Sequence, residues 1–173
     1  MLCRVCAAGT CSDREGGFTF CEMRRKRQQT EDAVCLEILR TAKRGVLAVL
    51  GDGEYPYTVP MDFVYEDGFI YFHCAKEGHK LDAVRKHDKV SFCVLSEPVP
   101  EEGSWWFHVT SVIAFGSISE VEDPKEHDRC LRLLAHKYMP EEEIEGDMQR
   151  NAARAVVLAL RVEHVTGKQV KEK

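Results

Sequence analysis

The sequence predicts a mainly β protein, in which an antiparallel sheet closes into a small barrel and the helices lie outside it. Apolar and polar residues alternate over residues 57–65, which is the period of a half-buried strand. Turn sequences, Gly-Asp-Gly at 51–53 and Asp-Gly at 67–68, separate consecutive strand-like segments. Tight turns of this kind join antiparallel neighbours, so the pattern favours one antiparallel β-barrel with peripheral helices.

The composition is that of an ordinary globular domain. The chain has 173 residues, with 24 Lys and Arg against 29 Asp and Glu, for a net charge of −5. These values exclude collagen-like and low-complexity classes, and the mild acidity argues against a nucleic-acid surface. The longest apolar runs, residues 46–50 and 155–160, are too short to span a bilayer. We therefore expect neither nucleic acid nor membrane as a partner.

Half of the eight cysteines lie in the first 22 residues, namely Cys3, Cys6, Cys11 and Cys21. This segment has no helical or strand period, and glycines interrupt it. We expect residues 1–22 to be a flexible Cys-rich extension and residues 23–173 to fold as one domain. Four thiols can bind zinc by count, but their spacing fits no zinc pattern, so no metal site is expected. Arg4 interrupts the early apolar stretch, which argues against a secretory signal and favours a cytoplasmic location.

A helix is predicted over residues 30–43, where one stripe is apolar. Thr30 is expected to cap its start and Gly45 to end it. The basic run at 24–27 precedes this helix. Such a run can indicate nucleic-acid binding, but in an acidic chain we interpret it as a solvated entry segment.

The other elements follow by the same criteria. Pro60 cannot donate to a strand ladder, so it predicts an edge, bulge or gap in the strand over 57–65. Asp123 and Pro124 are typical of a helix start. The predicted order is a strand at 46–50, the strand at 57–65, a strand at 69–74, a helix at 77–86, a strand at 90–95, a loop at 98–103, a β-rich stretch at 105–121 bent near Gly116, a helix from 123, a second helix from 140, a strand at 155–165 and a tail at 167–173.

The sequence lacks the common signatures of nucleotide and hydrolase sites. It has neither Gly-x-Gly-x-x-Gly nor a phosphate loop that ends in Gly-Lys-Ser/Thr, and neither His-Glu-x-x-His nor Gly-x-Ser-x-Gly. Any site must therefore come from less standard features.

The most informative segment is residues 71–80, Tyr-Phe-His-Cys-Ala-Lys-Glu-Gly-His-Lys. It runs from a strand end through a turn into a helix start, where free N–H groups and the helix dipole attract an anion. Gly78 permits close approach of the backbone, and His79 and Lys80 can add charge and hydrogen bonds. The alternative is an ordinary exposed histidine and lysine at a helix start.

Several side chains near this segment have two interpretations. His73 can donate a hydrogen bond or a proton near neutral pH, or it can be a strand-end histidine bonded to backbone. The triplet 105–107, Trp-Trp-Phe, must place at least one ring outward, toward a subunit interface or a ligand. Cys74 and Cys93 are interpreted as small buried apolar residues rather than nucleophiles.

Five segments, in order and at the right intervals, resemble one known family. They are residues 23–28 (Met-Arg-Arg-Lys-Arg-Gln), 53–60 (Gly-Glu-Tyr-Pro-Tyr-Thr-Val-Pro), 71–80, 90–94 (Val-Ser-Phe-Cys-Val) and 111–116 (Ser-Val-Ile-Ala-Phe-Gly). Together they resemble the Nim-type 5-nitroimidazole resistance proteins, which belong to the pyridoxamine 5′-phosphate oxidase-like, FMN-binding split-barrel superfamily. The resemblance covers about residues 23–168.

The resemblance implies a homodimer with FMN in a cleft between the subunits. The phosphate would lie at Gly78, His79 and Lys80, and His73 would correspond to the histidine implicated in activity. The remaining implied cofactor contacts are Val59, Pro60, Met61 and Asp62 along the flavin ring, His73, Cys74 and Ala75 at the ring and ribityl chain, and Ser111 and Val112 on a neighbouring strand.

The resemblance thus implies an FMN-dependent oxidoreductase that reduces nitro groups of small molecules. The alternative is a flavin- or haem-binding split-barrel protein with another physiological role, and a metal-binding or structural module built on the Cys-rich segment is a third. Residues 106–110 depart from the family pattern, which bears on the substrate side of the pocket. The basic residues of the tail, residues 165–170, are lysines alone, so vitamin B6 oxidation is not expected.

Overall fold

The computed structural model describes residues 20–172, and its strands form one antiparallel sheet. The sheet order is β2-β1-β5-β7-β8-β4-β3, with β6 paired to β7. The strands are β1 (Arg44–Leu50), β2 (Pro56–Asp62), β3 (Val64–Glu66), β4 (Phe69–Ala75), β5 (Lys89–Leu95), β6 (Val99–Pro100), β7 (Phe107–Glu120) and β8 (Ala155–Glu172). The predicted antiparallel, mainly β fold is confirmed. The predicted extension, residues 1–22, lies almost wholly outside the described residues.

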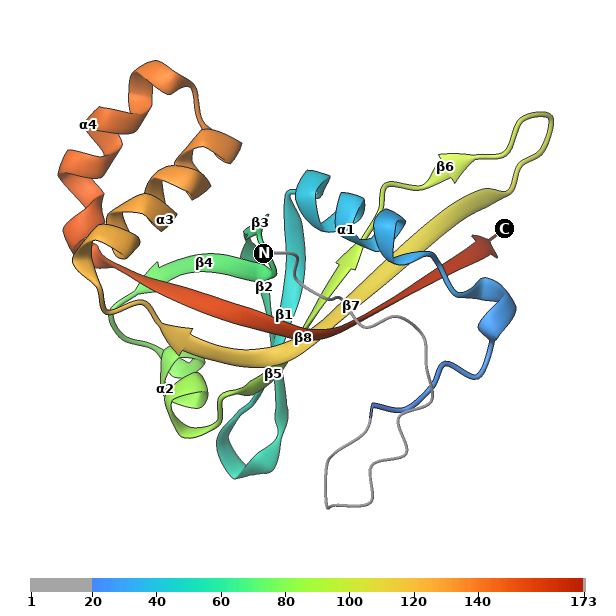
Figure 1. Ribbon diagram of the computed structural model, residues 1–173, viewed down its shortest axis with the longest axis horizontal. Helices are drawn as coiled ribbons and strands as arrows, with labels where there is room; N and C mark the ends of the chain where they lie inside the picture. The colour runs from blue at the N-terminus through green and yellow to red at the C-terminus, as the bar shows by residue number, and fades with distance from the viewer. Residues whose placement is uncertain (1–19, 173) are drawn as a thin grey trace.

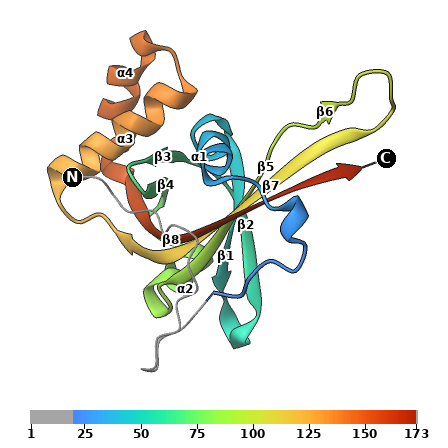
Figure 2. The same ribbon diagram turned by 45° about the vertical axis from the view of Figure 1, so that its right-hand side comes forward.

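The helices lie outside the sheet, as predicted (Figures 1 and 2). They are α1 (Asp32–Thr41), α2 (His79–Lys86), α3 (Pro124–Tyr138) and α4 (Glu141–Asn151), with single 3₁₀ turns η1 (Lys26–Gln28), η2 (Asp52–Glu54) and η3 (Ala152–Arg154). Asp123 caps α3, as expected, because its Oδ1 accepts from the backbone N–H groups of Lys125 at 3.1 Å and Glu126 at 2.8 Å. Within the described part of the chain, every helix is too short or too polar to cross a membrane.

The sheet curls around a core of aromatic and aliphatic side chains, and edge strand β2 comes into contact with β4. Phe92 lies at the centre of this core. Its ring meets those of Phe63 and Phe72 edge to face, at centroid distances of 4.8 and 5.0 Å, which is a favourable aromatic geometry. Leu39 of α1 is fully buried against the same cluster. We call this cluster the barrel core.

The α3–α4 pair covers the opposite face of β4 and β8 (Figure 1). Tyr71 and Val157 of the sheet pack there with Leu134 of α3 and with Ile144 and Met148 of α4. Burial of these apolar side chains holds the helix pair on the sheet. We call this second cluster the helix-side core.

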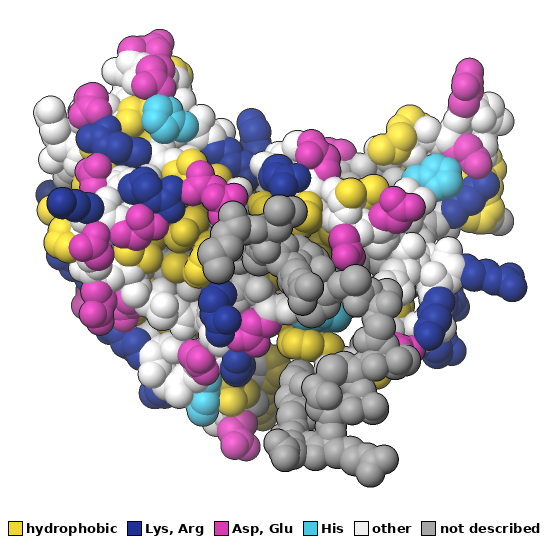
Figure 3. All heavy atoms as spheres, viewed as in Figure 1, with side chains coloured by type: hydrophobic (Ala, Val, Ile, Leu, Met, Phe, Trp, Pro, Cys, Tyr) yellow, Lys and Arg dark blue, Asp and Glu magenta, His cyan; other side chains and the backbone are white. Residues whose placement is uncertain are grey.

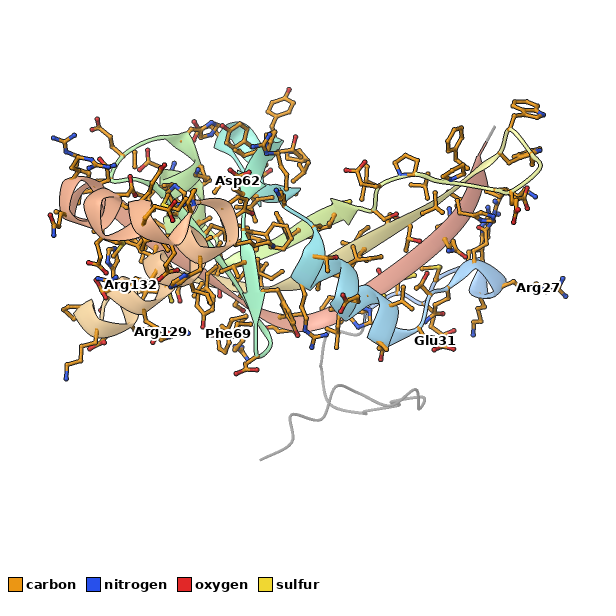
Figure 4. All side chains as sticks on the ribbon, turned by 90° about the horizontal axis from the view of Figure 1, so that it is seen from above. Arg27, Glu31, Asp62, Phe69, Arg129 and Arg132 are labelled. Atoms are coloured by element: carbon orange, nitrogen blue, oxygen red, sulfur yellow. The ribbon has the colours of Figure 1, made fainter. Side chains whose placement is uncertain are left out.

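Strands β7 and β8 continue past the barrel and form an arm with β6, residues 97–110 and 169–172. In the space-filling view, the α3–α4 pair and the arm rise on either side of a concave stretch (Figure 3). Asp62, Arg129 and Arg132 lie in the half of the molecule with α3 and α4, whereas Arg27 and Glu31 lie toward the arm (Figure 4).

The bend predicted near Gly116 is confirmed as a β-bulge. Phe115 pairs with His164 but Gly116 pairs with Val162, so Glu163 is an extra residue on β8. Glycine is required at 116, because a Cβ there would lie 1.9 Å from a backbone oxygen of β8. A similar restriction holds where α1 meets β8, since a Cβ on Gly167 would lie 2.2 Å from the Cys35 sulfur.

Some predicted boundaries are wrong. Helix α1 begins at Asp32 with Glu31 as its N-cap, and Gly45 lies in β1 rather than at a helix end. The predicted loop at 98–103 contains the short strand β6, and the predicted tail at 167–173 continues β8 because its backbone pairs with β7.

The predicted strand at 57–65 is two strands, because the chain leaves the ladder at Phe63. The backbone N–H of Phe63 donates to the Tyr138 hydroxyl at 2.8 Å instead of to a strand. The expectation for Pro60 is confirmed, since it lies on edge strand β2, where a missing N–H breaks no ladder.

Candidate functional site

Strand β4 places the predicted site residues on two faces of the sheet. Side chains alternate along a strand, so Phe72 and Cys74 face the barrel core while Tyr71 and His73 face the α3–α4 side. A ligand that touches both Cys74 and His73 must therefore lie across an edge of the sheet.

Such an edge exists where β2 meets β4. Strand β2 pairs with β1 alone, and β4 pairs with β3 only up to Tyr71. From Phe72 to Ala75, β4 pairs with β8 on one side only. Unpaired strand edges carry free N–H and C=O groups. The split between β2 and β4 therefore offers hydrogen-bonding backbone to a flat polar ligand.

Lys80 lies at one end of this split, in the first turn of α2. Its Nζ is half-buried and lies 3.2 Å from the Met61 sulfur, which is a weak acceptor. No carboxylate pairs with Lys80 among residues 20–172. The other cations of α2 are paired, Arg85 with Glu120 at 2.7 Å and Lys86 with an aspartate at 3.3 Å. Lys80 is thus the cation of α2 that can take an anion.

Gly78 forms the N-cap of α2 with φ of 130°, in the region that favours glycine. A Cβ there would meet nothing within 4 Å, so the approach to the helix start is open. The exposed N–H groups and the positive end of the dipole both favour a negative group at this place.

His79 faces a neighbouring hollow of about 480 Å³ between α2 and the β1–β2 turn. Its ring stacks on Tyr57 at 4.2 Å, and its Nε2 lies 3.4 Å from Asp52 Oδ2. Asp52 also takes Lys86. The structure thus brings Met61, His79 and Lys80 together and gives His79 a carboxylate neighbour.

Cys74 is half-buried beside the split. Burial raises the pKa of its thiol above the ordinary value, while Lys80 opposes the rise. A thiol with a raised pKa stays protonated near neutral pH and is a poor nucleophile, which agrees with its interpretation as a packing residue.

His73 lines a cavity of about 390 Å³ between β2, β4 and the α3–α4 pair. Its side chain is exposed and makes no hydrogen bond within residues 20–172, so the backbone-bonded alternative does not hold there. The other polar lining residues are Asp62, Tyr138, Asp147 and Asn151. The apolar walls are Leu131, Leu134, Ala135, Met139, Met148, Ala152 and Ala155.

Tyr138 fixes the wall of this cavity where β2 ends. Its hydroxyl accepts from the Phe63 N–H and lies 2.8 Å from the Phe63 carbonyl oxygen. It also contacts the carbonyl oxygen of Lys43. Burial raises the pKa of Tyr138, so the hydroxyl stays protonated and can donate to one of the two carbonyls. Beside it, Asp62 accepts from Arg44 Nε at 2.8 Å.

Lys137 lies on the other side of Phe63. Its Nζ donates to the carbonyl oxygen of Ala42 at 2.6 Å and lies 4.3 Å from the Phe63 ring centroid, in cation–π geometry. Burial lowers the pKa of Lys137 to about 8. This ammonium therefore belongs to the junction between β1, β2 and α3.

Ser111 and Val112 lie far from the split within one chain. Ser111 pairs with Lys168, whereas His73 pairs with Val157, eleven residues earlier in β8. At about 3.3 Å per residue this separation is roughly 35 Å. Val112 is fully buried in the barrel core. One chain thus brings together the predicted residues of β2, β4 and α2, and not those of β7.

The aromatic triplet lies near the tip of the arm. Trp105 and Phe107 are 66% and 42% exposed, and Trp106 is half-buried. The structure thus places two of the three rings outward, toward neither the split nor the cavity.

Sequence reasoning missed the α3–α4 contributions to the cavity. Tyr138 falls on the inward stripe expected for its helix, and that stripe was the available signal. Asp147 and Asn151 lie in an acidic helix with no distinguishing pattern. Their position depends on how two helices dock on a distant strand.

These features define a class: an antiparallel split barrel with an open anion site and free strand edges at its split. The family profile described as pyridoxamine 5′-phosphate oxidase matches residues 31–169. The chain belongs to the pyridoxamine 5′-phosphate oxidase family. No curated protein matches it.

Solved structures confirm the split-barrel fold. A candidate 5-nitroimidazole antibiotic resistance protein from Bacteroides thetaiotaomicron VPI-5482 is 20% identical, with a TM-score of 0.70 over 82% of this chain and 86% of that one. An FAD-binding protein from Mesorhizobium loti is 23% identical, with a TM-score of 0.60 over 82% and 96%. An FAD- and haem-binding protein from Mycobacterium smegmatis is 19% identical, with a TM-score of 0.67 over 82% and 72%.

Proposed function

We propose that the chain binds FMN at the split between β2 and β4 and reduces nitro groups of small molecules of the 5-nitroimidazole type. The observation that carries this proposal is Lys80, a half-buried ammonium at the start of α2 whose neighbour is a thioether. A phosphate is the group that such a position favours. The family and the flavin-binding proteins that share the fold support the same cofactor.

The residues present fit a flavin nucleotide. Gly78, His79 and Lys80 would hold the phosphate, and residues 59–62 of β2 would lie along the ring. Residues 73–75 of β4 would face it across the split, with their backbone edge unpaired by β3. A bound flavin supplies the electron transfer, while the protein supplies position, electrostatics and exclusion of water.

His73 would act on the substrate. Its ring is exposed in the cavity and without a hydrogen-bond partner in the described chain, so it can bind a nitro oxygen or deliver the proton that reduction requires. Asp62 lines the same cavity but is held by Arg44. We therefore assign the proton-transfer role to His73.

A second copy would complete the site. Ser111 lies roughly 35 Å from His73 along the sheet, so its implied cofactor contact requires the β7 of a partner subunit. The base and arm also expose Leu95, Val99 and Phe107, and exposed apolar side chains of this kind favour association. We propose a homodimer with the cleft between subunits. The cytoplasmic location remains a prediction.

The decisive experiment is a visible spectrum of the purified protein before and after addition of FMN. The proposal expects a yellow protein that, once reduced anaerobically, is reoxidised by a 5-nitroimidazole with formation of the reduced product. A protein that takes up no flavin contradicts the proposal. Flavin uptake without nitro reduction supports the alternative, a flavin- or haem-binding protein with another role, which the Mycobacterium smegmatis structure favours.

The phosphate assignment is tested by Lys80→Ala. Loss of a charge-assisted bond to phosphate should weaken FMN binding about tenfold to a hundredfold, measured by fluorescence titration. Lys125→Ala is the matched control, because Lys125 is likewise the second residue of its helix but lies on α3. Equal affinity in the two variants removes Lys80 from the cofactor site.

The role of His73 is tested by His73→Ala. The variant should keep FMN affinity and lose turnover by about 10²- to 10⁴-fold, the usual contribution of a positioned proton donor. His87→Ala, at an exposed histidine after α2, is the control and should leave turnover unchanged. Unchanged turnover in His73→Ala would exclude the proposed role.

A further inference from the structure

The cavity beside His73 has the size and walls of a ligand pocket. Its volume is about 390 Å³, within the range of roughly 300–1,000 Å³ that small-molecule sites occupy. Leucine and methionine side chains of α3 and α4 form its walls, and a few polar groups converge on it from α4 and the strands. Apolar walls with sparse polar groups suit a small ring rather than a peptide or a sugar.

The charges that line the cavity are all carboxylates. No lysine or arginine lines it. Asp62 is offset by Arg44 at 2.8 Å, and Lys137 on α3 contacts Phe63 and Ala42 rather than the cavity. Asp147 differs from Asp62, because its Oδ1 accepts from Asn151 Nδ2 at 2.7 Å and no cation pairs with it within the described residues. Asp147 is thus the uncompensated charge of the cavity.

We infer that this cavity is the substrate pocket, and that it takes small aromatic or heteroaromatic molecules that are cationic or neutral and rejects anionic ones. The assignment as a substrate pocket rests on the proposed function, whereas the charge preference in binding does not. An anion entering an apolar cavity loses its hydration and meets the Asp147 carboxylate at close range. A cationic group gains the same carboxylate as its partner, and the neutral ring gains the apolar walls.

Three probes that share one nitroaromatic ring test the preference: 4-nitrobenzylamine, 4-nitrobenzyl alcohol and 4-nitrobenzoate. Binding to the oxidised full-length protein is measured by calorimetry at neutral pH, so no turnover is needed. The amine and the alcohol should each bind at least about tenfold more tightly than the benzoate. Equal affinity of amine and benzoate overturns the inference.

Two variants locate the binding. Asp147→Asn keeps the size of the side chain and should remove the advantage of the amine over the alcohol while leaving alcohol affinity unchanged. Ala152→Trp should fill the cavity and abolish binding of all three probes, whereas Ala153→Trp, at the exposed next residue of η3, should bind them normally. An unchanged amine advantage in Asp147→Asn, or normal binding in Ala152→Trp, overturns the inference.

Turnover separates this inference from the proposed function. If the binding preference is found but the reduced protein transfers no electrons to the amine probe, the charge preference stands and the proposed function fails. If all three probes are reduced with equal kcat/KM and bind equally, the function stands and the charge preference fails.

Discussion

The two faces of the β4–β8 pair differ in how completely they are packed. On the barrel side, Phe72 and Leu158 are fully buried among rings and aliphatic chains. On the helix side, Val157 is equally buried, yet His73 two residues from the buried Tyr71 is exposed and a cavity remains beside it. One face thus maintains the fold, while the other leaves space that a ligand can use.

Polar contacts differ between the faces as well. Around the helix-side core, Arg129 contacts Glu66 and Glu126, and its guanidinium lies 5.5 Å from the Tyr71 ring centroid. Such half-exposed ion pairs stabilise a structure only slightly. The helix pair is therefore held by a smaller apolar cluster, and changes there should cost less than changes in the barrel.

The largest effect should follow Leu158→Ala. Leu158 is fully buried in the barrel core, so its truncation removes apolar contacts and leaves a cavity that closely packed neighbours cannot close. We expect the free energy of unfolding to fall by about 4 kcal/mol, measured by urea denaturation. A loss below about 2 kcal/mol would mean that the barrel side is as loosely packed as the helix side.

The same substitution on the helix side, Leu134→Ala, should cost about 2 kcal/mol, the low end for this change. Leu134 is buried but borders the existing cavity, so fewer contacts are lost. The same denaturation experiment applies. If Leu134→Ala costs as much as Leu158→Ala, the proposed difference between the faces is wrong.

The smallest effect concerns Lys137, at the junction of the two clusters. Burial lowers its pKa from 10.5 to about 8, so between these pH values the unfolded chain binds more protons than the folded one. The stability of the wild type should therefore rise with pH in this window, relative to Lys137→Met, by about 1 kcal/mol after allowance for partial exposure. Denaturation of both proteins at pH 8 and 10.5 measures the difference, and a flat difference would contradict the buried ammonium.

Local patterns were sufficient to predict most of the fold. The alternation over 57–65 and the Asp67–Gly68 turn gave antiparallel strands, and Asp123 marked the start of α3. The end of β8 was missed because residues 167–172 show no apolar alternation, and their pairing is backbone to backbone with β7. The break at Phe63 was missed because its cause, Tyr138, lies 75 residues away.

The candidate site divides in the same way. The strand end and helix start from His73 to Lys80 are contiguous, so their chemistry could be predicted together, as could the cation at the start of α2. The contact of Lys80 with Met61 and the place of Asp147 beside the cavity depend on tertiary docking. No local period encodes such contacts, so they required the structure.

The bulge at Glu163 gives β8 a spare residue. Deletion of one residue from a regular strand turns every later side chain to the other face. At Glu163 the deletion would instead leave a continuous ladder, with Val162 still opposite Gly116 and Gly167 still opposite Val112. The seat of α1 on Gly167 would survive, and the loss would be limited to the contacts of Glu163 with Lys89 and Ser117. The barrel half and the arm half of this strand can therefore change length independently at this one position.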